Sequence, residues 1–137
     1  MSPVIPIDLS PIVRILSADP GVQAVFLFGS HAVGRARRDS DIDLAVVPRD
    51  DTVRRRKLDL LADLAAAGVD DVDLVFLDTN DVTLRFEAVR QNRLLWAAPD
   101  FDHGSFWSRV VREYLDFEPI LARQRDALRR RLDHGTA

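Results

Sequence analysis

The sequence contains no cysteine, so it excludes disulfide bonds and thiolate metal sites, although this says nothing about the compartment. It also lacks any stretch near the roughly 18 apolar residues that a membrane-spanning helix needs. The first residues, MSPVIPIDLS, show neither a basic segment nor a long apolar run, so we expect no signal peptide. The default expectation is a cytoplasmic protein that makes no use of a membrane.

A large excess of charge of one sign is missing as well. The formal net charge is −3, which does not indicate direct binding of nucleic acid or of an anionic membrane. The 137 residues, 47% hydrophobic and 30% charged, have the balance of a globular protein with a sizeable core. We expect one domain over residues 1–137, with a core at about 9–98 and a C-terminal helical region at about 101–133.

The most informative stretch is residues 22–47, VQAVFLFGSHAVGRARRDSDIDLAVV. It predicts a strand, a glycine turn, a short helix, a polar loop and a second strand. The run Val22 to Phe28 is nearly all apolar, as in a strand that is covered on both faces. Gly29 lets the backbone turn tightly and approach a ligand. The residues after Ser30 can open a helix whose free N–H groups form a seat for phosphate.

Two aspartates open the second strand, which is predicted from Asp41 to Val47 and stopped by Pro48. The period-two geometry of a strand places Asp41 and Asp43 on one face, roughly 6–7 Å apart. Without a cation, such a pair beside an apolar strand would be unfavourable. Since Mg²⁺ is usually held by one or two carboxylates together with phosphate oxygens, the stretch predicts a site for a Mg²⁺–triphosphate complex.

The pattern GSHAVGRARRDSDIDL resembles the Gly-Ser, spacer, Asp-x-Asp signature of the DNA polymerase β-like nucleotidyltransferases, and most of all the minimal nucleotidyltransferase (MNT) proteins. The resemblance covers most of the chain. It implies an α/β (α+β) fold in which a small mixed sheet bears three aspartates, with helices packed behind it and a long C-terminal helix region. It also implies attack of a partner hydroxyl on the α-phosphorus of a nucleoside triphosphate, aided by two Mg²⁺ ions.

Within that family the resemblance further implies a role as an antitoxin. Such a protein transfers AMP from ATP onto a tyrosine of a HEPN-type ribonuclease toxin, silences it, and forms a hetero-oligomer with it. The segment YLDFEP at residues 114–119 is similar to the C-terminal helix of MNT proteins that are paired with HEPN ribonucleases.

The same resemblance assigns roles to individual residues. Asp41, Asp43 and a third carboxylate on a neighbouring strand would hold the metal and act in catalysis. Asp71 and Asp73 share a face by parity, but Asp73 lies inside the predicted strand Val72–Leu77 and is favoured. The other candidates for the third carboxylate are Asp70 and Asp78.

The triphosphate would be bound by Gly29 and Ser30, and by Arg37, which matches a basic position common just before the family's Asp-x-Asp. Of the three neighbours Arg35, Arg37 and Arg38, we expect one to grip phosphate or partner. The three histidines do not make a metal site, and His31 is read as a surface residue near the nucleotide.

Helices and one edge strand account for the remaining chain. We expect Ser10 to cap a first helix and Asp51–Thr52 to cap a second, which buries apolar side chains at helical spacing and ends at Gly68. Thr79-Asn80-Asp81 is a cap signal for a third helix, Val82 to Gln91, which would end at Asn92, before an edge strand at residues 93–97. The last helix begins near His103, and Pro119 should kink or split it. The expected buried positions of the second and last helices include Val53, Leu58, Leu61, Leu64, Ala65, Phe106, Val110, Val111, Tyr114 and Leu115.

Three other functions compete with the antitoxin hypothesis. The chain resembles small-molecule nucleotidyltransferases of the aminoglycoside type, which would need a separate substrate-binding subunit here. It could instead be an antitoxin that neutralises its partner by binding alone. A nucleic-acid polymerase is least favoured, because the net charge is acidic and no template-binding domain is evident.

Overall fold

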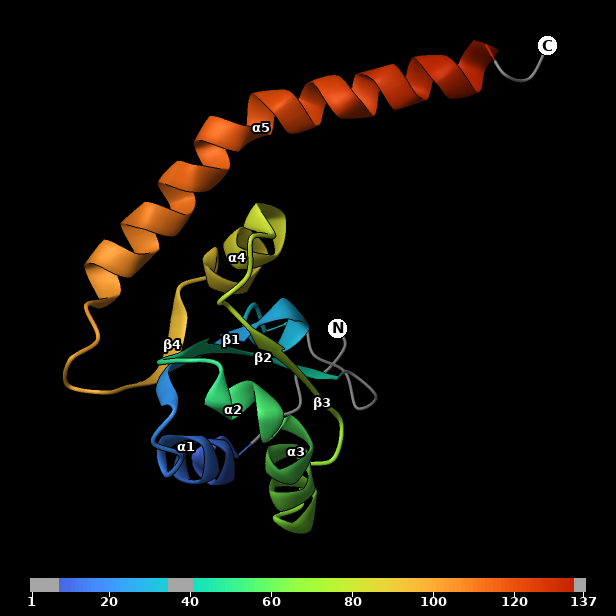
Figure 1. Ribbon diagram of the computed structural model, residues 1–137. Coiled ribbons are helices and arrows are strands. Elements are labelled where there is room, and N and C mark those ends of the chain that lie inside the picture. The colour runs from blue at the N-terminus through green and yellow to red at the C-terminus, as the bar shows by residue number, and fades with distance from the viewer. Residues whose placement is uncertain (1–7, 35–40, 135–137) are drawn as a thin grey trace.

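The computed structural model describes residues 8–34 and 41–134. Its centre is a four-stranded mixed sheet in the order β3-β2-β1-β4 (Figure 1). β2 pairs with β3 in parallel, whereas β1 pairs antiparallel with both β2 and β4. The mixed sheet and the edge position of β4 are as the sequence predicts. The strands are β1 (Val22–Phe28), β2 (Ile42–Pro48), β3 (Val72–Phe76) and β4 (Arg93–Ala97).

Helices cover both faces of this sheet (Figure 1). Ala24 and Phe26 of β1 point into one cluster, while Val25 and Leu27 point into the other, so the central strand is buried on both sides. This double burial explains why β1 is almost wholly apolar. One face carries α1 (Ser10–Ser17), α2 (Thr52–Arg55) and α3 (Lys57–Ala66), and the other carries α4 (Val82–Val89) and α5 (His103–His134).

Several local signals in the sequence act as predicted. Gly68 has φ of +91° and follows α3, where its N–H donates to Ala65 and the N–H of Val69 donates to Leu64. These two bonds form a Schellman ending. Asp81 caps α4 by accepting the N–H of Leu84 at 3.0 Å, and Asn92 has φ of 55° beyond that helix.

Other expectations about helix starts and strand ends are corrected. Asp8, and not Ser10, accepts a backbone N–H at the start of α1, since Ser10 itself is already helical. At α2 the side chain that accepts the N–H of Thr52 belongs to Asp50 and not to Asp51. Pro48 does not lie just beyond the end of β2, as predicted from the sequence. It is the last residue of the strand and pairs with Val22.

The second predicted helix is broken in two at Arg56. The guanidinium of Arg56 donates to both carboxylate oxygens of Asp19, at 2.9 and 2.6 Å, and ties this break to the end of α1. The buried side chains Val53, Leu60 and Leu64 keep one helical face across the break. Leu58 lies about 140° from Val53 and is 80% exposed, against expectation. Leu115 in α5 is likewise exposed, at 61%.

α5 remains one helix of 32 residues with Pro119 inside it, and Figure 1 shows that it changes direction along its length. Its N-terminal half packs on α4 and on the sheet through Phe106 and Val110, as predicted. None of the helices among the described residues has both the length and the apolar character needed to cross a bilayer.

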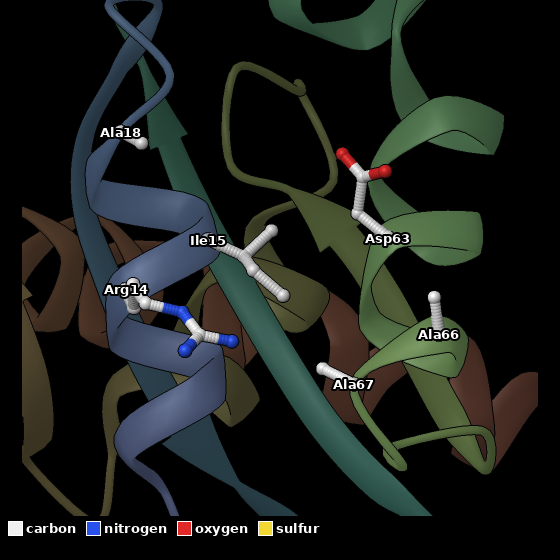
Figure 2. A pocket seen from close by; sticks show the side chains of 6 residues that line it. All are labelled: Arg14, Ile15, Ala18, Asp63, Ala66 and Ala67. Atoms are coloured by element: carbon white, nitrogen blue, oxygen red, sulfur yellow. The ribbon is translucent and has the colours of Figure 1, made fainter.

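An open pocket lies between α1 and α3 (Figure 2). Arg14 and Ile15 line it from α1, and Asp63 lines it from α3. These two helices cover the face of the sheet opposite to the one that holds α4 and α5. The pocket therefore lies on the opposite side of the sheet from α4 and α5.

Candidate active site

Two of the predicted carboxylates are brought together by the parallel pairing of β2 and β3. Asp43 and Asp73 are direct partners in the register, so their side chains stand next to each other on one face. The N–H of Ile42 donates to the carbonyl of Asp71 at 2.7 Å, which fixes the starts of the two strands. Asp41 is exposed and directly precedes β2. The three favoured aspartates therefore gather where β2 and β3 begin.

The carboxylates lie at the rim of the face that α4 and α5 cover. Ala45, two residues after Asp43 on the same face, is fully buried in the cluster beneath these helices. Asp43 itself is half-buried and Asp73 is exposed. The site is therefore exposed to solvent on one side and bounded by the apolar cluster on the other. It is separate from the pocket between α1 and α3.

The environment of Asp43 disfavours its negative charge. Burial raises the pKa of the Asp43 carboxyl, and the charges of Asp73 and Asp41 raise it further, while His31 acts in the opposite direction. The like charges that raise the pKa of Asp43 are held near it by the fold and not by mutual attraction. A cation placed among them would relieve this repulsion.

The donor set fits Mg²⁺, which prefers oxygen ligands and completes its shell with water and phosphate oxygens. In the described part of the chain no three acidic or histidine side chains converge into a ready metal cage. One or two carboxylates plus a triphosphate are sufficient for Mg²⁺, so the arrangement suits an ion that arrives with a nucleotide.

Gly29 meets the carboxylate of Asp43. It has φ of +72°, and a Cβ built on it would clash with Oδ2 of Asp43 and lie 3.1 Å from Cγ. The contact arises because Phe28, the last residue of β1, pairs with Asp43 across the sheet. The sequence suggested close approach to a ligand at Gly29 but gave no sign of this contact, which depends on the register of β1 and β2.

The turn after β1 is a single 3-10 turn, η1 (Gly29–His31), where the sequence predicts a glycine turn followed by a short helix. Since Gly29 abuts Asp43, η1 holds Ser30 beside the carboxylates. Arg37, the predicted phosphate ligand, lies outside the described residues, as do Arg35 and Arg38.

The other three candidates for the third carboxylate lie outside β3. Asp70 and Asp71 precede β3, and Asp78 follows it and forms an ion pair with Arg54. Only Asp73 among the four is the register partner of Asp43. The pairing supports the choice made from the sequence.

The raised pKa of Asp43 gives a pH-dependent stability prediction for the metal-free protein. A carboxyl whose pKa is higher in the folded state opposes folding once it is ionised, and this opposition vanishes where the carboxyl is neutral in both states. We expect Asp43→Asn to unfold at a higher urea concentration than the wild type at neutral pH. Near pH 3, about one unit below an ordinary aspartate pKa, the two midpoints should converge. A gap that is the same at both pH values would contradict this account.

A mixed sheet whose parallel strands bring aspartates together beside a Gly-Ser turn defines the architecture of a nucleotidyltransferase. A family model described as polymerase beta, nucleotidyltransferase matches residues 11–100. The chain belongs to this family.

Among curated proteins, the chain is similar to the protein adenylyltransferase MntA of Shewanella oneidensis, with 37% identity over 83 residues. The match covers 61% of this chain and spans 60% of that relative's length.

Solved structures extend the similarity over nearly the whole chain. The crystal structure of a toxin–antitoxin with AMP-PNP aligns with a TM-score of 0.69 and 31% identity, covering 96% of this chain and 100% of that one. The structure of a tri-AMPylated Shewanella oneidensis HEPN toxin in complex with its MNT antitoxin aligns with a TM-score of 0.62 and 30% identity, covering 93% and 95% of the two chains.

Proposed function

We propose that this chain is a Mg²⁺-dependent nucleotidyltransferase that transfers AMP from ATP to a tyrosine of a HEPN-type ribonuclease toxin and thereby neutralises it. The observation that carries the proposal is the pairing of Asp43 with Asp73 beside the Gly29–Ser30 turn. It is supported by the similarity to a protein adenylyltransferase and to an MNT antitoxin in complex with an AMPylated HEPN toxin.

Each residue of the site has a part in this proposal. Asp41, Asp43 and Asp73 would hold two Mg²⁺ ions, whose charge offsets that of the triphosphate and of the pyrophosphate that leaves. The Gly29–Ser30 turn receives the triphosphate through backbone N–H groups and the Ser30 hydroxyl. Arg37 is proposed as a further phosphate ligand.

The reaction is a single displacement at phosphorus. The tyrosine oxygen of the toxin bonds to the α-phosphorus, and the bond from that phosphorus to the oxygen bridging to the β-phosphate breaks. Pyrophosphate leaves with the electron pair, and Asp73 accepts the proton of the hydroxyl. Because Asp43 and Asp73 are adjacent register partners, the base and the metal-binding carboxylate are held side by side.

The partner and the setting follow from the same proposal. The protein acceptor is a HEPN-type toxin, with which the chain forms a hetero-oligomer. A single domain over residues 1–137 and a cytoplasmic location stay predictions.

The position of the label in ATP tests the reaction. The chain, Mg²⁺ and a HEPN-type toxin are incubated with ATP labelled at either the α- or the γ-phosphorus. We expect labelled toxin with α-labelled ATP only, because the β- and γ-phosphates leave together. Label from the γ-position would show phosphoryl transfer instead, and would overturn the proposal.

Asp73→Asn and Asp71→Asn form a matched pair that tests the third carboxylate. We expect Asp73→Asn to lower the rate of AMP transfer about 100-fold or more, the scale on which loss of a catalytic charge acts. Asp71→Asn should stay within a few-fold of the wild type, because Asp71 contributes its backbone carbonyl to the sheet. The initial rate of label incorporation measures both. A large loss in Asp71→Asn with little loss in Asp73→Asn would reverse the assignment.

A further inference from the structure

The C-terminal half of α5 carries an apolar stripe that the protein itself leaves open. Figure 1 shows this half extending away from the sheet. Phe117 is 37% exposed, Leu128 55% and Leu132 62%, and Leu121 is half-buried between them in sequence. At 100° per residue these four side chains fall within an arc of about 60°. The surface they form, here called the distal stripe, runs for roughly 23 Å along the helix.

The distal stripe continues the buried side of the same helix. On an ideal helix, Val110 and Tyr114 fall in the same arc as the four distal residues. Val110 is buried on the sheet, and Tyr114 stacks on Phe86 of α4 with ring centroids 3.9 Å apart. The face that α4 and the sheet cover in the N-terminal half is therefore uncovered beyond Pro119. Such a face requires an occupant.

The spacing of the distal stripe is symmetric. Its members are separated by four, seven and four residues, so the pattern reads the same in both directions about a point between residues 124 and 125. Two copies of the helix laid antiparallel about that point place Phe117 of each copy opposite Leu132 of the other. Leu121 then faces Leu128, and Gln124 faces Arg125. An isologous two-fold contact needs this kind of self-complementarity.

The two ends of the C-terminal half of α5 differ in charge, and this difference also bears on the direction of a helix pair. Asp116 and Glu118 give its upstream end an acidic character. Downstream, three consecutive exposed arginines make the opposite end basic; they are Arg129, Arg130 and Arg131. In the antiparallel register Glu118, which also pairs with Arg125 of its own helix, lies opposite Arg131 of the other copy. Arg123 lies opposite Asp126, and Asp116 opposite Asp133 is the like-charge pair of this register. A parallel arrangement in register would align every like charge.

We infer that the distal stripe is the contact surface for a second copy of this chain, joined in an antiparallel helix pair centred between residues 124 and 125. The contact is small, with four apolar side chains from each copy, and it gives a dimer that forms with rising protein concentration. This surface is separate from the carboxylate site, and the inference does not depend on the proposed AMP transfer.

Cysteine cross-linking tests the register directly, because the chain has no cysteine of its own. Leu121→Cys and Leu128→Cys proteins are oxidised separately and as an equal mixture, and disulfide-linked dimers are measured on a non-reducing gel. In the antiparallel pair residue 121 faces residue 128, while two copies of residue 121 lie seven residues, or about 10 Å, apart along the axis. A disulfide does not span that separation. We expect at least about five-fold more cross-linked dimer in the mixture than in either protein alone.

A control and a second measurement complete the test. Leu115→Cys replaces a leucine that is about as exposed as Leu128 but lies on the opposite side of the helix, and it should give only background cross-linking. Light scattering of the unmodified chain should show mass rising from monomer to dimer with concentration. A chain that stays monomeric, or equal cross-linking of Leu121→Cys alone and in the mixture, overturns the inference. Protection of the stripe only when a HEPN-type protein is added would also overturn it, by assigning the surface to that partner.

Discussion

The double substitution Asp41→Asn, Asp43→Asn is expected to abolish AMP transfer, lowering the rate at least about 1,000-fold. Both changes keep the size of the side chains but remove charge from the site where β2 and β3 begin. Since the ionised Asp43 is disfavoured in the fold, the substitution should not weaken the free protein. Loss of activity with unchanged or increased stability would separate a catalytic role from a structural one.

The measurement is the initial rate of transfer to the toxin, with the urea midpoint of each protein determined alongside. Asp59→Asn, an exposed position in the first turn of α3, serves as the control for removal of a surface carboxylate. It should retain the wild-type rate. Residual transfer within ten-fold of the wild type in the double variant would exclude these two aspartates as the metal-binding pair.

Gly29→Ala is expected to produce the second large effect, a loss of about 100-fold or more in transfer rate. A Cβ at residue 29 would clash with the carboxylate of Asp43, and alanine resists the φ of +72° found there. Either the turn or the carboxylate must move, and both belong to the same site. The rate of AMP transfer at saturating ATP measures the effect.

Gly34→Ala provides a closely matched control. Gly34 has φ of +71°, almost the value at Gly29, but a Cβ built on it meets nothing within 4 Å in the described structure. Both variants therefore pay a similar backbone penalty of about 1 kcal/mol, and only Gly29→Ala disturbs Asp43. Equal losses of activity in the two variants would show that backbone strain, and not the contact with Asp43, explains the effect.

Local patterns in the sequence are sufficient to predict the elements that hold the site. The nearly all-apolar run Val22 to Phe28 predicts the observed bounds of β1. The alternation of residues in a strand puts Asp43 with Ala45 on one face. Gly68, Asp81 and Asn92 are placed correctly, because capping depends on a few neighbouring residues. Parity does not separate Asp73 from Asp71; the position of Asp73 inside the strand favours it, and its part as the third carboxylate stays a prediction.

Features that depend on contacts between distant residues were not predictable in this way. The break at Arg56 is tied to an ion pair with Asp19, 37 residues earlier. The contact of Gly29 with Asp43 requires the register between β1 and β2. By contrast, the exposure of Leu58 and Leu115 follows from helical periodicity, because each lies more than 100° from the buried side chains of its helix.

The most direct test of the central claim is the intact mass of the HEPN-type partner after incubation with this chain, Mg²⁺ and ATP. The same incubation with the Asp41→Asn, Asp43→Asn variant is the control. We predict that the partner gains the mass of one or more AMP groups with the wild-type chain only. An unchanged mass, together with a stable complex formed by both versions, would contradict nucleotidyl transfer and leave an antitoxin that acts by binding.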